Sequence, residues 1–292
     1  MLMTSCGSAA TGPTTTKAVK PPKPEGSTTT ANITTTTVAS GTPQSTLPQA
    51  SPIWMITYTA ATKYLPAPLS NKILSNPSNY IIYGPRQHPG SWPSKSLADF
   101  KSYETLMNQF SLLNPNAIYG AVVDLENWSY TPVPEQRNPA MYYTMASSKL
   151  HSATLKLVAT PGLDLFKGLG QGPLYSLMLD SGLYKSVAKV ADVVDIQAQS
   201  LENDPSAYEN FVRQAAAQIR SVSPSVVILA GLTTSAKSGV TPSGQTLEVD
   251  ARNVFGIVNG FWINVPSGGA TCPSCSPINP QPAVTLLQSY LK

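Results

Sequence analysis

The chain has 292 residues, of which 12% are charged, and its formal net charge is +4. This small positive charge argues against a nucleic-acid partner, and no run of eighteen apolar residues is present that could cross a membrane. The low charge, the 27 prolines and the many threonines and serines favour an exported or cell-surface protein, extracellular in location, over a cytosolic one.

The first 51 residues consist largely of threonine runs and prolines, such as Thr14–Thr16 and Thr34–Thr37, without apolar periodicity. Such a segment buries too little surface to offset its chain entropy, so residues 1–51 are predicted to be a disordered tether. Cys6 follows small residues and resembles the lipobox of bacterial lipoproteins, although no basic and apolar leader precedes it. The resemblance implies a lipid anchor at Cys6, which would be the means of attachment to a membrane.

From Pro52 onward, short apolar or β-branched runs alternate with segments of helical pattern. The runs predicted to be strands are Ile53–Thr59, Tyr80–Tyr83, Ile118–Asp124, Leu155–Thr160, Val193–Gln199, Val226–Leu232 and Gly260–Val265. The predicted helices are Leu97–Leu113, a helix opened by Asn138-Pro139, Leu183–Ala191, a helix opened by Asp204-Pro205, Leu247–Val258 and Pro282–Leu291. Helical spacing predicts that four side chains after Pro139 face the core: Met141, Tyr142, Met145 and Leu150.

This alternation predicts a parallel sheet with helices outside it. We expect residues 52–292 to form an α/β domain of the (β/α)8 type, a TIM barrel, with an eighth strand in the weakly patterned segment Thr62–Leu74. An open doubly wound sheet is the alternative, but no Gly-x-Gly-x-x-Gly follows the first strand. Cys272 and Cys275 are predicted to form a short-loop disulfide in an oxidising compartment, with free thiols as the alternative.

Polar and aromatic side chains gather where the predicted strands end, which in a TIM barrel is the mouth that holds the active site. Asp124 and Glu126 lie two residues apart, so they share one face at the end of the central strand. Seven further residues near strand ends are predicted to bind a sugar by ring stacking or by hydrogen bonds: Tyr58, Tyr83, Trp128, Asp195, Gln197, Trp262 and Asn264.

Several of these residues also have a structural interpretation. Trp262 could fill the barrel interior, and Trp128 could pack over the barrel wall. Asp195 could be the buried partner of Arg86 or of a lysine. No single residue decides between the two interpretations, but the candidates agree in place and in chemistry, and this agreement favours a saccharide site.

Other chemistries find less support in the sequence. A serine hydrolase would need a Gly-x-Ser-x-Gly elbow and a late histidine, whereas the last histidine is His151. No metal site is predicted, because His88 and His151 are the only histidines. No cofactor is predicted either, because the glycine-rich segment Gly168–Gly172 lacks the Lys-Ser/Thr of a phosphate loop. Glycoside chemistry based on carboxylic acids needs neither histidine nor cysteine.

Around Val122–Trp128 the chain resembles chitinase-like barrels of glycoside hydrolase family 18. That family ends a central strand with an Asp-x-Glu pair and often carries a tryptophan on its last strand. Asp124-Leu125-Glu126 and Trp262 match these two features. The resemblance implies that Glu126 is the general acid and that Asp124 orients and stabilises the acetamido group in substrate-assisted retention. It also implies that Gln197 takes the place of a tyrosine that supports this group.

The chain departs from the family at Tyr119 and Val122, where the full motif has aspartates. The strand that ends at Asp124 is also the third visible strand, whereas the family uses the fourth. The sequence predicts a secreted or surface-tethered glycoside hydrolase that cleaves an oligosaccharide or polysaccharide by carboxylate acid/base catalysis. The missing aspartates favour the alternative, a non-catalytic saccharide-binding or cell-wall-associated lipoprotein.

Overall fold

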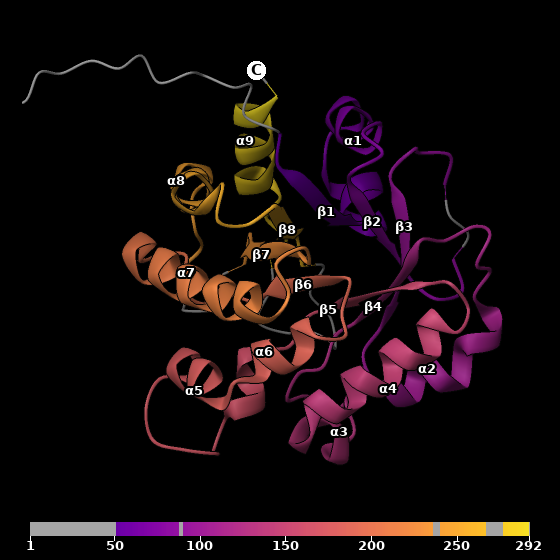
Figure 1. Ribbon diagram of the computed structural model, residues 1–292. Helices are drawn as coiled ribbons and strands as arrows, with labels where there is room; N and C mark the ends of the chain where they lie inside the picture. The colour runs from indigo at the N-terminus through magenta and orange to yellow at the C-terminus, as the bar shows by residue number, and fades with distance from the viewer. Residues whose placement is uncertain (1–50, 88–89, 236–239, 267–276, 292) are drawn as a thin grey trace, which may run out of the picture. The chain divides into compact units, whose positions relative to one another are not determined.

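The structure, a computed structural model, describes residues 51–87, 90–235, 240–266 and 277–291. Eight parallel strands form a closed barrel in which successive strands pair and β8 pairs with β1 (Figure 1). The strands are β1 (Ile53–Thr57), β2 (Tyr80–Tyr83), β3 (Lys95–Phe100), β4 (Gly120–Val123), β5 (Lys156–Ala159), β6 (Val193–Ile196), β7 (Val227–Thr233) and β8 (Gly260–Asn264). The predicted TIM barrel is therefore confirmed.

Helices lie outside the barrel and connect its strands (Figure 1). The α-helices are α1 (Ala67–Leu74), α2 (Tyr103–Gln109), α3 (Val133–Arg137), α4 (Pro139–His151), α5 (Leu174–Ser181), α6 (Leu183–Ala188), α7 (Pro205–Val222), α8 (Gly244–Val254) and α9 (Gln281–Tyr290). A π-helical turn, Ala60–Tyr64, and two 3₁₀ helices, Phe110–Leu112 and Leu163–Phe166, complete the connections. Within the described ranges, no helix is both long and apolar enough to span a membrane.

Alternation along the strands sorts their side chains into two layers. Side chains of one layer point into the barrel and pack together: Met55, Tyr80, Ile82, Leu97, Val122, Val158, Val193, Leu229 and Trp262. Side chains of the other layer pack against the helices, as Phe261 and Ile263 do on either side of Trp262. A residue two positions beyond an inward-facing residue also points inward, so the residues that follow the strands at this spacing enter the mouth of the barrel.

The position of β3 corrects two predictions. Thr62–Leu74 is not the eighth strand, because it contains most of the π-helical turn and α1. The missing strand is β3, which overlaps the start of the predicted helix Leu97–Leu113. The helix in this segment begins only after Ser102, whose side chain caps its first turn. The inward positions at the end of β3 hold Asp99 and then Lys101, so the strand lacks the apolar run that is typical of a buried strand.

The helix α4 begins at Pro139 as predicted, but its buried face differs from the prediction. Met141 and Met145 are 49% and 40% exposed, so the prediction that they face the core is wrong. Leu150 is buried as predicted and Tyr142 is partly buried, while Tyr143 and Ala146 are buried in place of the two methionines. Both stripes have the three- and four-residue spacing of a helix, so the spacing alone could not decide which stripe faces the barrel.

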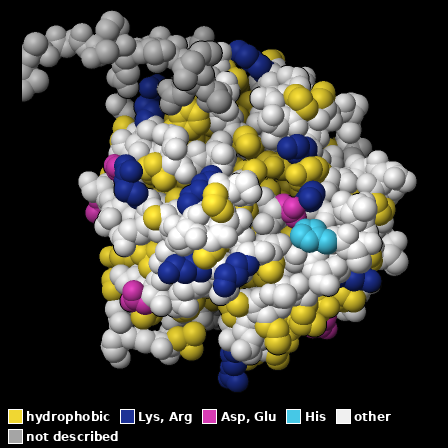
Figure 2. All heavy atoms as spheres, in the orientation of Figure 1, with side chains coloured by type: hydrophobic (Ala, Val, Ile, Leu, Met, Phe, Trp, Pro, Cys, Tyr) yellow, Lys and Arg dark blue, Asp and Glu magenta, His cyan; other side chains and the backbone are white. Residues whose placement is uncertain are grey.

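A charged cluster around Asp192 lies at the N-terminal ends of β5 and β6, opposite the mouth. The carboxylate accepts hydrogen bonds from His151 Nε2 at 2.7 Å and Leu157 N at 2.9 Å, and Lys156 Nζ lies 2.9 Å away. Figure 2 shows the described histidine, in cyan, beside acidic and basic side chains. Burial alone would raise the pKa of Asp192, but these contacts lower it below its ordinary value. His151 therefore takes part in a hydrogen bond with Asp192, away from the mouth.

Some predictions concern residues outside those described. Apart from Ser51, the tether of residues 1–51 lies there, as does the lipid anchor at Cys6. The disulfide between Cys272 and Cys275 lies there as well. These features stay predictions.

Candidate active site

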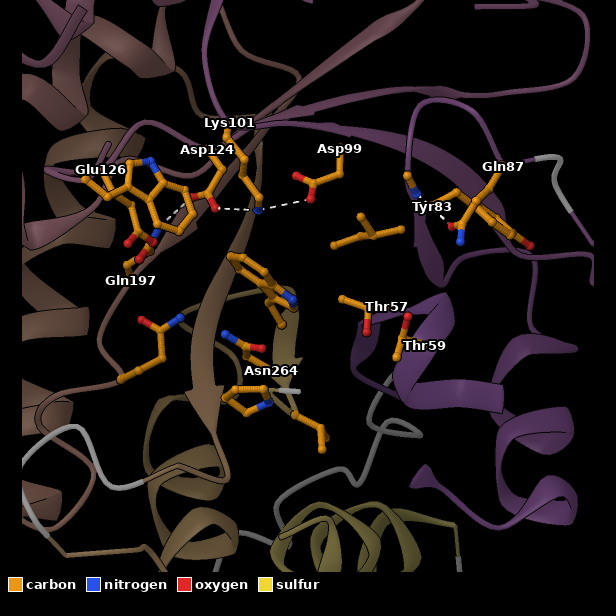
Figure 3. A pocket seen from close by; sticks show the side chains of 17 residues that line it. Thr57, Thr59, Tyr83, Gln87, Asp99, Lys101, Asp124, Glu126, Gln197 and Asn264 are labelled. Carbon is orange, nitrogen blue, oxygen red and sulfur yellow. Dashed lines mark hydrogen bonds and ion pairs between the residues drawn. The ribbon is translucent and has the colours of Figure 1, made fainter. Parts of the chain in front are cut away.

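A cavity of about 330 Å³ opens at the carboxyl ends of the strands (Figure 3). Its lining comes from the ends of β1, β2, β3, β4, β6 and β8 and from the loops that follow them. The described lining residues are Thr57, Thr59, Ile82, Tyr83, Gly84, Gln87, Asp99, Lys101, Asp124, Glu126, Trp128, Gln197, Gln199, Trp262, Asn264, Val265 and Pro266. The cavity therefore occupies the mouth in which the active site is predicted.

The end of β4 brings Asp124 and Glu126 to the same cavity, as the two-residue spacing predicts. Asp124 N donates to Phe100 O at 2.9 Å, so the chain still runs alongside β3 at this point. Leu125, between the two acids, is buried among the outward-facing residues. Asp124 is only 2% exposed, whereas Glu126 is partly exposed. One acid is thus buried at the cavity wall, and the other is open to the cavity.

Three donors hold the carboxylate of Asp124. Oδ1 accepts hydrogen bonds from Gln197 Nε2 and Thr160 Oγ1, both at 2.9 Å, and Oδ2 accepts one from Lys101 Nζ at 2.9 Å. Gln197 Nε2 also donates to Thr160 O at 2.8 Å, which fixes the side-chain amide. The amide and ammonium groups can only donate at these nitrogens, so Asp124 acts as a hydrogen-bond acceptor in this arrangement.

Lys101 joins two carboxylates. Its Nζ lies 2.9 Å from Oδ2 of both Asp99 and Asp124 (Figure 3) and 5.3 Å from the ring centre of Trp128. Burial alone would lower the pKa of Lys101, but the charges of Asp124 and Asp99 raise it above its ordinary value. Burial raises the pKa of Asp99. The charge of Lys101 lowers this pKa and the like charge of Asp124 raises it, so that the pKa stays above its ordinary value. The sequence alone does not reveal Asp99 and Lys101 as site residues, because Asp99 lies on the unpredicted strand β3 and Lys101 follows that strand directly.

Asp195 does not reach the cavity. It lies within β6, is fully buried, and is absent from the described lining residues, so the predicted contact with a sugar is not seen. Neither carboxyl oxygen has a hydrogen-bond partner among the described residues, so the alternative, a pair with Arg86 or a lysine, is not seen either. Burial, followed by the charge of Asp124, raises the pKa of Asp195 well above its ordinary value. Asp195 stands two residues before Gln197 and therefore lies one layer deeper in the barrel.

Two tryptophans line the cavity, as predicted. Trp262, on β8, is 5% exposed and packs with the inward-facing layer, so it fills the barrel and borders the cavity at once. Its Nε1 has no acceptor among the described residues. Trp128 Nε1 donates to Thr131 Oγ1 at 2.7 Å, which fixes the indole near Lys101.

The two predicted tyrosines differ in position. Tyr83 lines the cavity, whereas Tyr58 is not among the described lining residues. Their rings stack with centroids 5.1 Å apart, and the Tyr83 hydroxyl accepts a hydrogen bond from Gly90 N at 2.7 Å. Tyr58 therefore supports Tyr83 instead of bordering the cavity. Asn264, at the end of β8, lines the cavity as predicted.

Gly162 leaves room for the side chain of Glu126. It follows β5, and its N donates to Leu125 O at 2.9 Å. A Cβ atom at this position would lie 2.8 Å from Glu126 Cγ and 2.7 Å from Asp164 Oδ1, both shorter than normal contacts. The glycine therefore helps to set where Glu126 lies. Across the described ranges, no group of three or more histidine, cysteine or acidic side chains is arranged to hold a metal ion.

No protein-family model matches this chain, and no curated protein does either. Solved structures do match it. A Bacteroides thetaiotaomicron protein named for alpha-L-fucosidase activity has 7% sequence identity and a TM-score of 0.51, over 87% of this chain and 97% of its own. The spore cortex-lytic enzyme SleL of Bacillus megaterium has 10% identity and a TM-score of 0.50, over 85% of this chain and 75% of its own. The likeness is one of fold. It agrees with the TIM barrel.

Proposed function

We propose that the protein is a glycoside hydrolase that cleaves an oligosaccharide or polysaccharide. The observation that carries the proposal is the acid pair after β4: Asp124 is buried and held by three donors, while Glu126 opens to a cavity that Trp128 and Trp262 also line. Indole faces can pack against sugar rings, and the amides of Gln199 and Asn264 can bind hydroxyl groups. The names of the two enzymes of similar fold, a fucosidase and a cortex-lytic enzyme, agree with this class.

In this proposal Glu126 protonates the glycosidic oxygen, and Asp124 supports the substrate. A general acid must come within hydrogen-bond reach of the leaving oxygen, and Glu126 is the more exposed of the two acids. A carboxylate offers about four acceptor positions, of which Asp124 uses two on Oδ1 and one on Oδ2. The remaining position on Oδ2 could accept the N–H of an acetamido group, which is the role that the resemblance to family 18 implies.

Two structural features support the resemblance to family 18. With β3 counted, Asp124 follows the fourth strand, so the discrepancy in strand number disappears. Gln197 donates to Asp124, in the region where the family often places its supporting tyrosine. Acids near Asp124 also come from neighbouring strands, because Asp99 on β3 and Asp195 on β6 both interact with its charge. Asp99 and Asp195 thus give Asp124 acidic neighbours, which the sequence motif around Asp124 lacks upstream.

A specific observation favours a second candidate function, a non-catalytic saccharide-binding protein. Val122, which stands where the family has an aspartate, is 1% exposed and packs in the barrel interior. Tyr119 packs against the same layer. Apolar and aromatic packing thus replaces the two upstream acids of the family's motif, which a binding protein would tolerate.

We also propose that the protein works outside the cell, tethered by residues 1–51 with a lipid at Cys6, and that Cys272 and Cys275 form a disulfide. The composition of the tail and the spacing of the cysteines support these proposals. Mass spectrometry of the native protein tests both. An unmodified Cys6 would contradict the anchor, and two free thiols at Cys272 and Cys275 would contradict the disulfide.

The function is tested by incubating the full chain with chromogenic glycosides and insoluble polysaccharides, and by measuring both reducing ends and retention on each polysaccharide. Release of reducing ends by the wild type but not by Glu126→Gln is the expected result. Retention without release in either protein would contradict the hydrolase and favour the binding protein. Neither release nor retention on any substrate would contradict both.

A further inference from the structure

The charged groups of the cavity differ in how far they reach into it. The side chains of Asp99 and Lys101 are 24% and 30% exposed, whereas that of Asp124 is only 3% exposed. All three line the same cavity (Figure 3). A ligand that enters the cavity therefore meets Asp99 and Lys101 more readily than Asp124.

The pair offers one free donor next to one free acceptor. An ammonium group has three N–H donors, and Lys101 uses one toward Asp99 and one toward Asp124, so one remains. Oδ2 of Asp99 accepts from Lys101 and has capacity for a second hydrogen bond. These two groups are 2.9 Å apart, and the ion pair holds them at that spacing.

We infer that Asp99 and Lys101 bind two neighbouring hydroxyl groups of a sugar ring, one donating to Asp99 and the other accepting from Lys101. The inference rests on the proposed function and names the substrate feature that this part of the site selects. Hydroxyl groups on adjacent ring carbons lie about as far apart as two hydrogen-bonded atoms, so they fit a donor and an acceptor that are themselves paired. Both contacts involve charged groups, which makes them stronger and more selective than contacts between neutral groups.

The charge of the cavity also limits which sugars can bind. Among the described lining residues, three carry carboxyl groups, namely Asp99, Asp124 and Glu126, and Lys101 alone carries an ammonium group. Lys101 already lies against two of these carboxylates, so the described lining residues offer no further cation to an acidic sugar. A uronic acid at this position would add a like charge to the site. The selected sugar is therefore one with a free vicinal diol and without a carboxylate.

The inference can be tested by measuring affinity of the full chain for free sugars by saturation-transfer NMR titration. The probes are D-glucose, D-galactose, D-mannose and N-acetyl-D-glucosamine, followed by the deoxy forms of each sugar that binds, each lacking one of its hydroxyl groups, and by its uronic acid. We expect loss of either hydroxyl of one adjacent pair to weaken binding about tenfold, and the uronic acid to bind at least tenfold more weakly. Equal affinity for every deoxy form, or no binding by any probe, would overturn the inference.

The variant Asp99→Ala tests whether Asp99 and Lys101 cause the weaker binding of the deoxy sugars. One deoxy sugar lacks the hydroxyl that donates to Asp99. We expect its tenfold loss of affinity to fall below about twofold in Asp99→Ala, because the variant has already lost that hydrogen bond. Asp180→Ala, which removes an exposed acid from α5, should keep the full penalty. A full penalty in a folded Asp99→Ala would overturn the inference, and if this variant does not fold, the wild-type comparison stands by itself. Diol-selective binding without release of reducing ends would contradict the hydrolase alone, and turnover without diol selectivity would contradict this inference alone.

Discussion

Lys101 Nζ lies 2.9 Å from Asp124 Oδ2, and this contact joins the ends of two neighbouring strands. The register of β3 and β4 pairs Asp99 with Val122, so Lys101, the first residue after β3, stands beside Asp124. Lys101 thereby places a positive charge between the two carboxylates. The buried acid of the site is held by a cation from the neighbouring strand, together with Thr160 and Gln197.

Replacing the cation should disable the site. We expect Lys101→Met to lower kcat at least about 100-fold, because Asp124 would lose one of its three donors next to another carboxylate. Two carboxylates without the cation between them repel each other, so the pKa of Asp99 should rise further and the acidic limb of the pH–rate profile should move to higher pH. Lys185→Met, which removes an exposed lysine of α6, is the control. A profile that keeps its acidic limb in Lys101→Met would contradict this role.

A methyl group at position 162 should displace Glu126. The backbone of Gly162 has φ −72° and ψ 140°, which alanine adopts without strain, so Gly162→Ala should lower Tm by only a few degrees. Its Cβ would lie 2.8 Å from Glu126 Cγ, so we expect kcat to fall about tenfold or more with a smaller change in KM. In the control Gly170→Ala, the three atoms nearest to the new Cβ all belong to the end of the Leu177 side chain, which can turn aside. Unchanged kcat in Gly162→Ala would show that the position of Glu126 does not limit turnover.

Asp250, on α8, should make the protein less stable as the pH rises. Burial, followed by the charge of Asp204, raises the pKa of Asp250 to about 7, and neither oxygen has a partner among the described residues. The unfolded chain loses this proton near pH 4 but the folded protein keeps it to about pH 7, so unfolding becomes easier across that interval. Asp250→Asn should be more stable than wild type at pH 8, on the order of 2 kcal/mol, with the gain vanishing near pH 4.

Thermal unfolding at several pH values checks this prediction, with Asp180→Asn as the control for loss of an exposed acid. A difference in Tm between Asp250→Asn and wild type that stays constant from pH 4 to pH 8 would contradict it.

Asp192 should have the opposite effect. Burial tends to raise its pKa, but His151, Leu157 N and Lys156 together lower it, so the folded protein favours the ionised form. Its stabilisation is present above the unfolded pKa near 4 and is lost as the pH falls through the lower folded value. Asp192→Asn should lower stability at pH 7 by about 1 kcal/mol, because the cluster is partly exposed, and the loss should shrink below pH 4. Glycan turnover at 25 °C should stay unchanged, since the cluster lies opposite the mouth.

The sequence predicts seven strands and the barrel because those strands are buried on both faces and read as apolar runs. It misses β3 because Asp99 and Lys101 occupy inward positions at its end, where an apolar run would be expected. The helix α7 is predicted well because two signals coincide. Asp204 accepts a hydrogen bond from Ala207 N, and the apolar side chains after Pro205 fall on one buried face.

The sequence predicts those parts of the site whose residues are close together both along the chain and in the structure. Asp124 and Glu126 reach one cavity because a two-residue spacing after a strand fixes their directions. The contacts of Asp124 with Lys101, Thr160 and Gln197 depend on the register among β3, β4, β5 and β6, which a single sequence does not reveal. The sequence also does not reveal how deep Asp195 lies. The position at which β6 ends in the barrel determines which of its inward-facing residues reaches the mouth.

In the proposed function, Glu126 delivers a proton to a glycosidic bond. The most direct test compares reducing-end release by wild type, Glu126→Gln and the exposed-acid control Glu104→Gln on the same glycan, with glycan binding measured in parallel. We predict that Glu126→Gln loses at least about 99% of turnover while its glycan affinity changes less than about threefold, and that Glu104→Gln matches wild type. Wild-type turnover in Glu126→Gln would contradict the claim.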